Sequence, residues 1–177
     1  MISQEKTKEV LDRFADYVIQ QSRSNLTKGK INASKDLYNS FKKNLVVSPN
    51  SIQMSIEAEG YWKFIDKGVR GAGGVRRTTS KFNSKNNKGK LWKIKAKDSI
   101  YKFGKSGGIS PKHFREWAKR KGISEFAVAK AVYHQGIKPT KFLTTPFERA
   151  FKALPDEVVE AYGLDLESFF EYTLNRN

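Results

Sequence analysis

The sequence predicts an α+β fold, in which a small antiparallel β-sheet packs against a long N-terminal helix and C-terminal helices. Three observations support this class. Apolar residues recur at helical spacing over residues 4–23, they alternate with polar residues over 52–58, and Ser-Pro or Thr-Pro pairs open helical segments after residue 110. A chain of 177 residues usually forms one domain, so we expect a single domain over residues 1–177.

The N-terminal part predicts a helix followed by a β-hairpin. Ser3 is positioned to cap the helix, and residues 24–36 are rich in Ser, Asn, Lys and Gly, which favours a loop. Ser48-Pro49-Asn50 is a turn signal between two strand patterns, so the flanking strands should pair as a hairpin. The apolar stripe that we expect on one face of the helix comprises Val10, Leu11, Phe14, Tyr17, Val18 and Gln21.

A short helix is predicted over residues 60–68. It should end at Gly68, because glycine readily adopts the left-handed backbone conformation that closes helices. A basic, Gly- and Lys-rich insertion or arm over residues 69–105 follows it. A long loop without regular structure is usually functional or disordered. We therefore expect this insertion to contact a partner.

Prolines and glycines mark the helices of the C-terminal half. Ser110-Pro111 opens a helix pair over residues 111–135, since serine is a favoured cap and proline a favoured first helical residue. Two more helices open at Thr145-Pro146 and at Pro155. Gly163 is expected to divide the last of them, because glycine is unfavourable inside helices.

The net positive charge is concentrated in the middle of the chain. Residues 61–122 hold 19 Lys and Arg against 3 acidic residues, whereas the other 115 residues hold 15 of each sign. Residues 154–177 hold six acidic residues and one basic residue, which predicts an acidic C-terminal helix whose charge could attract the basic segment of a neighbouring copy. The basic segment points to an anionic partner. The contact candidates are Arg70, Arg76, Arg77, Lys81, Lys85, Lys88 and Lys90.

Catalytic groups are scarce. The chain has no Cys, which excludes disulfides and thiolate metal sites, and its only histidines are His113 and His134. Gly104-Lys105-Ser106 resembles the end of a phosphate-binding loop, but Ser99 occupies the position of the required first glycine. No run of about 18 apolar residues is present, so we expect no membrane partner. The sequence predicts a protein that is not an enzyme and has no cofactor and no metal.

A DNA-binding protein is the alternative interpretation. In the helix pair over residues 111–135, Ala118, Gly122 and Val128 have the spacing of a helix-turn-helix. Lys and Arg residues in the basic segment also interleave with aromatic residues. This arrangement suits contacts with phosphates and stacking of nucleic-acid bases on the aromatic rings. In this alternative, the helix pair and the basic segment together would bind DNA.

Several short motifs follow one another in a defined order. Lys35-Asp36-Leu37-Tyr38-Asn39-Ser40 precedes the first strand, and Tyr61-Trp62-Lys63-Phe64-Ile65-Asp66-Lys67-Gly68 follows the second. The helix pair contains Trp117-Ala118-Lys119-Arg120-Lys121-Gly122-Ile123, and Gly136 to Pro146 follow it. In this order, across residues 5–160, the chain resembles the tail-completion, or head–tail joining, proteins of long-tailed phages. The motif positions are Tyr61, Phe64, Gly68, Trp117, Gly122, Gly136, Pro139 and Phe142.

This resemblance implies a structural, non-enzymatic protein of the virion neck or tail, assembled in the host cytoplasm. Members of the family form a ring at the base of the head–tail connector. The partners that the resemblance implies are copies of the chain itself, about six or twelve in a ring, and the connector and tail proteins of the virion. DNA in the channel is a further candidate for contact with the basic segment.

Overall fold

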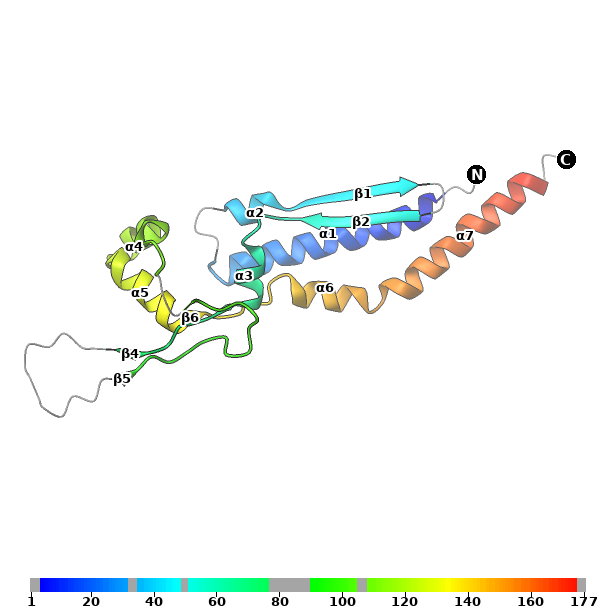
Figure 1. Ribbon diagram of the computed structural model, residues 1–177. Coiled ribbons are helices and arrows are strands. Elements are labelled where there is room, and N and C mark those ends of the chain that lie inside the picture. The colour runs from blue at the N-terminus through cyan, green and yellow to red at the C-terminus, as the bar shows by residue number, and fades with distance from the viewer. Residues whose placement is uncertain (1–3, 32–34, 49–50, 77–89, 105–107, 175–177) are drawn as a thin grey trace, which may run out of the picture. The chain divides into compact units, whose positions relative to one another are not determined.

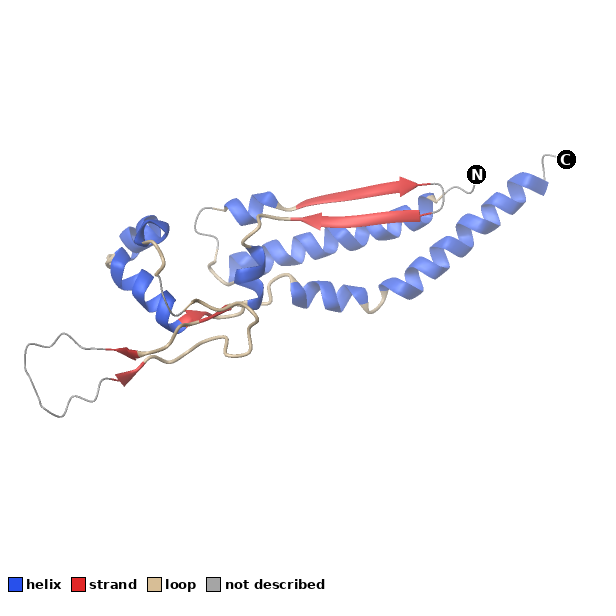
Figure 2. Ribbon diagram, viewed as in Figure 1, coloured by secondary structure: helices blue, strands red, loops and turns tan. Residues whose placement is uncertain are grey.

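The computed structural model describes residues 4–31, 35–48, 51–76, 90–104 and 108–174 (Figure 1). It has the predicted α+β class, with long helices and small antiparallel strand pairs (Figure 2). The sequence analysis expects one domain, whereas the structure groups the chain into two compact units. Unit 1 comprises Met1–Gly60 and Lys141–Asn177, and unit 2 is Tyr61–Thr140, which is inserted between them in the sequence.

Unit 1 is built around helix α1 (Glu5–Lys28), which lies between a β-hairpin and the C-terminal helices α6 (Thr144–Phe151) and α7 (Leu154–Leu174) (Figure 1). Its core joins Val10, Phe14 and Val18 of α1 to Leu154 and Ala161 of α7. These three α1 residues belong to the predicted stripe, which is confirmed for them. Elsewhere in the stripe Leu11 and Gln21 are partly buried, and Tyr17 is exposed.

Helix α1 is longer than predicted. Residues 24–28, expected as a loop, are its last turn, and Gly29 follows it. Leu26 is fully buried four residues after the buried Ser22, so the inner face continues beyond the predicted stripe. The Asn25 side-chain amide donates a hydrogen bond to the backbone carbonyl of Phe142 at 3.1 Å. Tertiary contacts therefore extend the helix into a segment whose composition favours a loop.

The predicted hairpin forms from β1 (Lys42–Ser48) and β2 (Ser51–Glu57), preceded by a short helix, α2 (Asp36–Ser40), that the sequence analysis does not predict. The strands are antiparallel, with Leu45 opposite Met54 and Lys43 opposite Ile56. Met54 and Ile56 pack against the core, so this face of the hairpin is the one turned toward α1.

Lys43 connects the hairpin to α1 through an ion pair. Its ammonium donates hydrogen bonds to Asp12 at 2.7 Å and Asp16 at 2.9 Å. These bonds, that to Asp12 first, raise the pKa of Lys43 above its ordinary value of 10.5. The stabilisation is therefore present below pH 10.5 and lost as pH rises through the folded-state pKa.

In urea unfolding, the difference in the free energy of unfolding between the wild type and Lys43→Met should shrink as pH is raised from below 10.5 to above the folded-state pKa of Lys43. A constant difference would contradict this prediction.

Asp165 caps α1 from a distant helix. The predicted cap, Ser3, lies outside the described residues, and the structure places Gln4 at the cap position without a side-chain cap bond. The carboxylate of Asp165, on α7, instead accepts hydrogen bonds from the backbone N–H groups of Lys6 and Thr7 at 3.1 and 3.0 Å. It also accepts one from the Thr7 hydroxyl at 2.9 Å. A buried carboxylate thus satisfies donors at the positive end of the α1 dipole.

Replacing Asp165 should therefore destabilise unit 1. We expect Asp165→Ala to lower the free energy of unfolding by about 2–3 kcal/mol, because it leaves two backbone N–H groups and a hydroxyl without their acceptor. Glu167→Ala, on the exposed side of the same helix, is the matched control and should change stability by about 0.5 kcal/mol or less. Urea unfolding followed by far-ultraviolet circular dichroism measures both. Equal effects of the two substitutions would show that the capping bonds contribute nothing.

Helix α7 is continuous through Gly163, so the predicted division there is wrong. Ala161 and Asp165 flank the glycine and are both buried in unit 1. Their contacts with α1 hold this turn helical although glycine costs about 1 kcal/mol in a helix interior.

The backbone of unit 2 is organised around residues 68–74. The predicted short helix is α3 (Trp62–Lys67), and Gly68 ends it as predicted. Its φ of 72° and ψ of 173° are not the left-handed helical conformation that the sequence analysis expects, but an extended one with positive φ that is open essentially to glycine alone. Strand β3 (Val69–Arg70), which comes directly after Gly68, pairs antiparallel with β6 (Gly136–Ile137). On its other side, the Arg70 N–H donates to the Tyr101 carbonyl at 2.7 Å, and Phe103 donates to the Arg70 carbonyl at 3.0 Å.

The remaining elements of unit 2 are short. They are β4 (Val75–Arg76), which pairs with β5 (Lys90–Leu91), the 3₁₀ turn η1 (Pro111–Phe114), and helices α4 (Arg115–Lys121) and α5 (Glu125–Gln135). The helix pair over residues 111–135 is thus confirmed, with a 3₁₀ turn where the sequence predicts the start of the first helix.

Candidate functional site

The charge of the chain follows the division into units. Unit 2, residues 61–140, holds 21 of the 34 basic residues and 4 of the 18 acidic ones, which leaves 13 basic and 14 acidic residues for unit 1. The predicted insertion over residues 69–105 accounts for 12 of the 21 basic residues. The positive charge is therefore a property of the whole second unit, not of the insertion alone.

The predicted insertion is partly built into unit 2. Ala72 and Gly73 donate backbone hydrogen bonds to the carbonyls of Tyr133 and His134, both at 2.9 Å. Arg70, one of the predicted contact residues, is exposed while its backbone bonds residues 101–103. Residues at both ends of the insertion thus hold unit 2 together.

The other predicted contact residues of the insertion are less fully described. For Arg76 and Lys90 the structure describes only the backbone, which pairs in the β4–β5 ladder. The remaining candidates, Arg77, Lys81, Lys85 and Lys88, lie outside the described residues.

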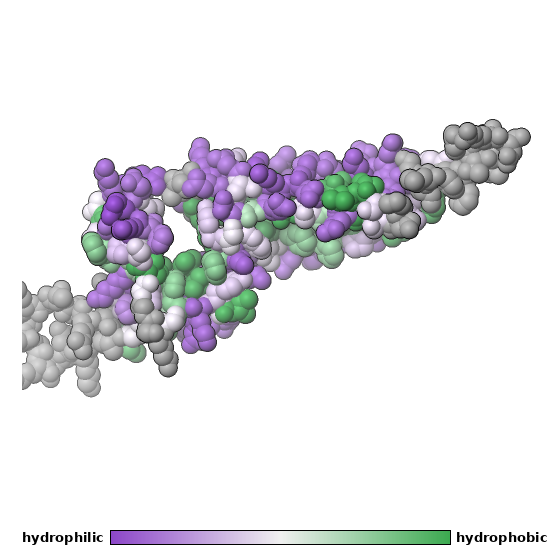
Figure 3. Space-filling view, turned by 45° about the horizontal axis from the view of Figure 1, so that its top comes forward, coloured by the Kyte–Doolittle hydropathy of each residue, from purple (hydrophilic) through white to green (hydrophobic). Residues whose placement is uncertain are grey.

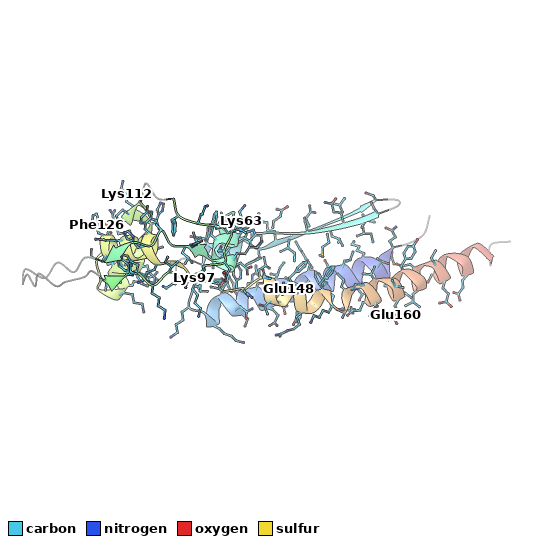
Figure 4. All side chains as sticks on the ribbon, turned by 60° about the horizontal axis from the view of Figure 1, so that its bottom comes forward. Lys63, Lys97, Lys112, Phe126, Glu148 and Glu160 are labelled. Atoms are coloured by element: carbon cyan, nitrogen blue, oxygen red, sulfur yellow. The ribbon has the colours of Figure 1, made fainter. Side chains whose placement is uncertain are left out.

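A second group of bases, which the list of contact candidates omits, lies on η1 and α4. These residues share exposure to solvent and lie within one stretch of ten residues. Arg115 is paired with Glu125 at 3.2 Å. Lys63, Lys97 and Lys112 are found at separate places on unit 2 (Figure 4). The basic surface is therefore spread over the unit and densest along η1 and α4, on Lys112, Arg115, Lys119, Arg120 and Lys121.

The turn between α4 and α5 has the local geometry that its sequence predicts. Gly122 has φ of 63°, and Ala118 is buried. The N–H of Gly122 donates to the carbonyl of Lys119 at 3.2 Å, and that of Ile123 to the carbonyl of Ala118 at 3.1 Å. This is the paired hydrogen-bond pattern of a Schellman motif. It accounts for the helix-turn-helix spacing without any DNA contact.

The second helix of the pair is poorly suited to reading DNA bases. Its exposed side chains are Phe126, Ala127 and Lys130. Phe126 is 68% exposed. Of these three side chains, only that of Lys130 can donate a hydrogen bond to the edge of a DNA base. The basic charge lies on the helix that precedes it. Any contact with nucleic acid would therefore be made mainly with phosphates.

The predicted motif positions differ in their surroundings. Gly68 and Gly136 allow close backbone contacts, because a Cβ atom on Gly136 would lie 2.2 Å from the Val69 carbonyl oxygen. Phe142 is buried in the core of unit 1, and its ring lies 6.3 Å from that of Phe41. Gly122 closes α4, and Pro139 is partly buried. The exposed aromatic positions are Tyr61, Phe64 and Trp117.

An apolar pocket of about 670 Å³ lies within unit 2, and the sequence analysis does not predict it. Its walls come from α3, residues 100–103, η1, α5 and β6. The phenyl ring of Phe64 meets that of Tyr101 edge to face at 4.8 Å. Figure 3 shows hydrophobic surface in this unit, bordered by hydrophilic side chains. The main lining residues are Phe64, Tyr101, Phe103, Phe114, Val132 and Ile137.

The two histidines occupy different environments. The His134 ring stacks on Trp92 with centroids 5.4 Å apart, and its Nδ1 hydrogen-bonds the Gly73 carbonyl, so Nδ1 carries the proton. His113 is exposed and lines the apolar pocket. Among the residues that the structure describes, no cluster of three or more His, Asp or Glu side chains could hold a metal ion.

No helix within the described ranges is long and apolar enough to cross a membrane. No family model, no curated protein and no solved structure matches the chain.

Proposed function

We propose that this protein is a structural subunit of a phage virion, which forms a ring in the neck or tail and joins the head connector to the tail. Unit 1 is the scaffold of each subunit in this proposal. Unit 2 presents the basic surface to an acidic neighbouring protein or to DNA in the channel.

The observation that carries the proposal is the segregation of charge between the two units. A nearly neutral unit 1 holds an acidic helix, and the inserted unit 2 carries 21 basic against 4 acidic residues. Such a distribution suits a subunit that meets an anionic neighbour at one place. The order of motifs from Tyr61 to Phe142 supports the same family.

Quantitative mass spectrometry of purified virus particles from the source tests this proposal. We expect a fixed copy number, because a closed ring holds a set number of copies, and about six or twelve per particle is the number that the resemblance implies. Absence from particles while the protein is made during infection would overturn it. The protein would then be a non-structural factor, and DNA binding would become the leading function.

DNA binding is the second candidate, and the exposed bases of η1 and α4 favour it. A sharp test replaces residues 77–89 by Asn-Gly, since Arg76 and Lys90 are paired antiparallel neighbours that a two-residue turn can connect. This replacement removes four basic residues of the protein and keeps the hydrogen-bonded residues 69–74. A deletion of the whole predicted insertion would remove those residues as well.

If residues 77–89 contact duplex DNA, the replacement should reduce the slope of log affinity against log salt by about 3–4. Neutralising Lys119, Arg120 and Lys121 to Ala should reduce that slope by about 3 if α4 makes the contact. Fluorescence anisotropy with a labelled duplex measures both slopes. A wild-type protein that does not bind duplex DNA at low salt would exclude this second function.

A further inference from the structure

Helix α7 carries two apolar stripes, and only one of them is buried in unit 1. The buried stripe contains Leu154, Val158 and Ala161, which pack in the core of unit 1, and the capping Asp165 lies on the same face. The second stripe follows at i, i+4, i+7 and i+11, the spacing of one helix face. Val159, within it, is 73% exposed. The residues of this second stripe are Pro155, Val159, Tyr162 and Leu166.

Acidic side chains border the second stripe. Asp156, Glu160 and Glu167 are exposed and share one helix face by their spacing along α7, and Asp156, three residues before Val159, is the one next to the stripe. In Figure 4, Glu160 projects outward from α7. The helix therefore presents an apolar ridge, exposed at Pro155, Val159 and Tyr162 and half-buried at Leu166, with negative charge beside it. This is the pattern of an amphipathic helix that docks in a partner groove.

The apolar pocket of unit 2 has the complementary chemistry. Ile100 on its rim is 74% exposed, and Lys102 lines it. Lys63 and Lys112 adjoin the lining residues Phe64 and His113 in the sequence, and both are exposed. A volume of about 670 Å³ is within the range of sites that bury ligand-sized groups, so it can admit side chains from one helix face.

We propose that the second stripe of α7 docks in the unit 2 pocket of another copy of this chain, with Val159 and Tyr162 as apolar anchors and Asp156 facing Lys102. Two different surfaces of one chain then meet head to tail, which generates rings or open chains of copies. The acidic helix and the basic rim select this occupant by charge. The inference rests on the proposed function in that the proposed ring needs such a contact between copies.

Sedimentation velocity of the full chain over a range of concentrations tests the contact. Wild-type protein should form oligomers, and raising the salt concentration to about 1 M, where the Debye length is about 3 Å, should weaken them. Val159→Glu on the helix and Ile100→Glu on the pocket rim should each weaken association by at least about tenfold, as loss of an interface anchor does. Both positions are exposed, so the fold should persist, which circular dichroism checks. Phe126→Glu, at an exposed position outside the pocket lining, should associate like the wild type.

Mixing the two defective variants gives the decisive result. Val159→Glu retains an intact pocket and Ile100→Glu retains an intact helix, so an equimolar mixture should form dimers and no larger species. Asp156→Lys should weaken association, and Lys102→Glu in the same chain should restore it. Glu148→Lys, on α6 in Figure 4, is the matched charge control and should have no effect.

A wild-type protein that stays monomeric, salt-insensitive association, a mixture that stays monomeric, or association unchanged in both variants would overturn the inference. Its failure is distinguishable from failure of the proposed function. Particles that contain the Val159→Glu protein at the wild-type copy number would contradict the contact between copies and leave the virion role intact. Head-to-tail association of a protein that is absent from particles would support the contact and contradict the virion role.

Discussion

Gly71→Ala should selectively unfold the second unit. A Cβ atom at residue 71 would lie 2.3 Å from the His134 carbonyl oxygen and 2.3 Å from the Gln135 carbonyl carbon. Both are backbone atoms, which cannot move away as a side chain would. The methyl group must separate residues 68–74 from residues 133–137, where backbone bonds such as Ala72 to Tyr133 hold the unit together. We expect a loss of about 3–5 kcal/mol in the free energy of unfolding.

The chain offers its own probe and controls for this experiment. All three tryptophans, Trp62, Trp92 and Trp117, lie in unit 2, so tryptophan fluorescence in urea reports on that unit. At Gly60 an added Cβ meets nothing within 4 Å, and Gly60→Ala should change stability by about 1 kcal/mol or less. Gly163→Ala should stabilise α7 by up to about 1 kcal/mol. A Gly71→Ala midpoint equal to that of Gly60→Ala would show that the backbone contact is not tight.

Phe142→Ala should have the largest effect on unit 1. Phe142 is 1% exposed, and its ring meets Phe41 edge to face. Removing the ring leaves a cavity in a packed core, which costs about 3–5 kcal/mol. Far-ultraviolet circular dichroism in urea should record the loss, since unit 1 contains the long helices α1 and α7.

Phe151→Ala is the matched control for this loss. Phe151 belongs to the same unit and is about half exposed, so its removal should cost about 1 kcal/mol or less. If the fluorescence transition of unit 2 shifts together with the helical signal, the two units unfold cooperatively. If Phe142→Ala behaves like Phe151→Ala, the packing of Phe142 is not a determinant of stability.

The candidate site was only partly predictable. The sequence alone locates the positive charge in the middle of the chain, because the positions of Lys and Arg along the chain do not depend on the fold. It cannot locate the apolar pocket, since Phe64, Tyr101, Phe114 and Val132 meet only when four separate segments pack together. The predicted insertion over residues 69–105 was bounded by its Gly- and Lys-rich composition. That composition does not reveal that Arg70 to Gly73 form backbone bonds within unit 2.

Local patterns in the sequence determined the α+β class, the hairpin and the glycines that end α3, α4 and α5, because each depends on residues a few positions apart. Only the tertiary structure decided the features that join distant segments. Leu26 extends α1 through burial, and Asp165 caps α1 across 158 residues from Thr7. Gly163 stays helical because its neighbours pack on α1. The division at Tyr61 and Thr140 is likewise decided by packing, since contacts between residues distant in the sequence leave no periodicity in it.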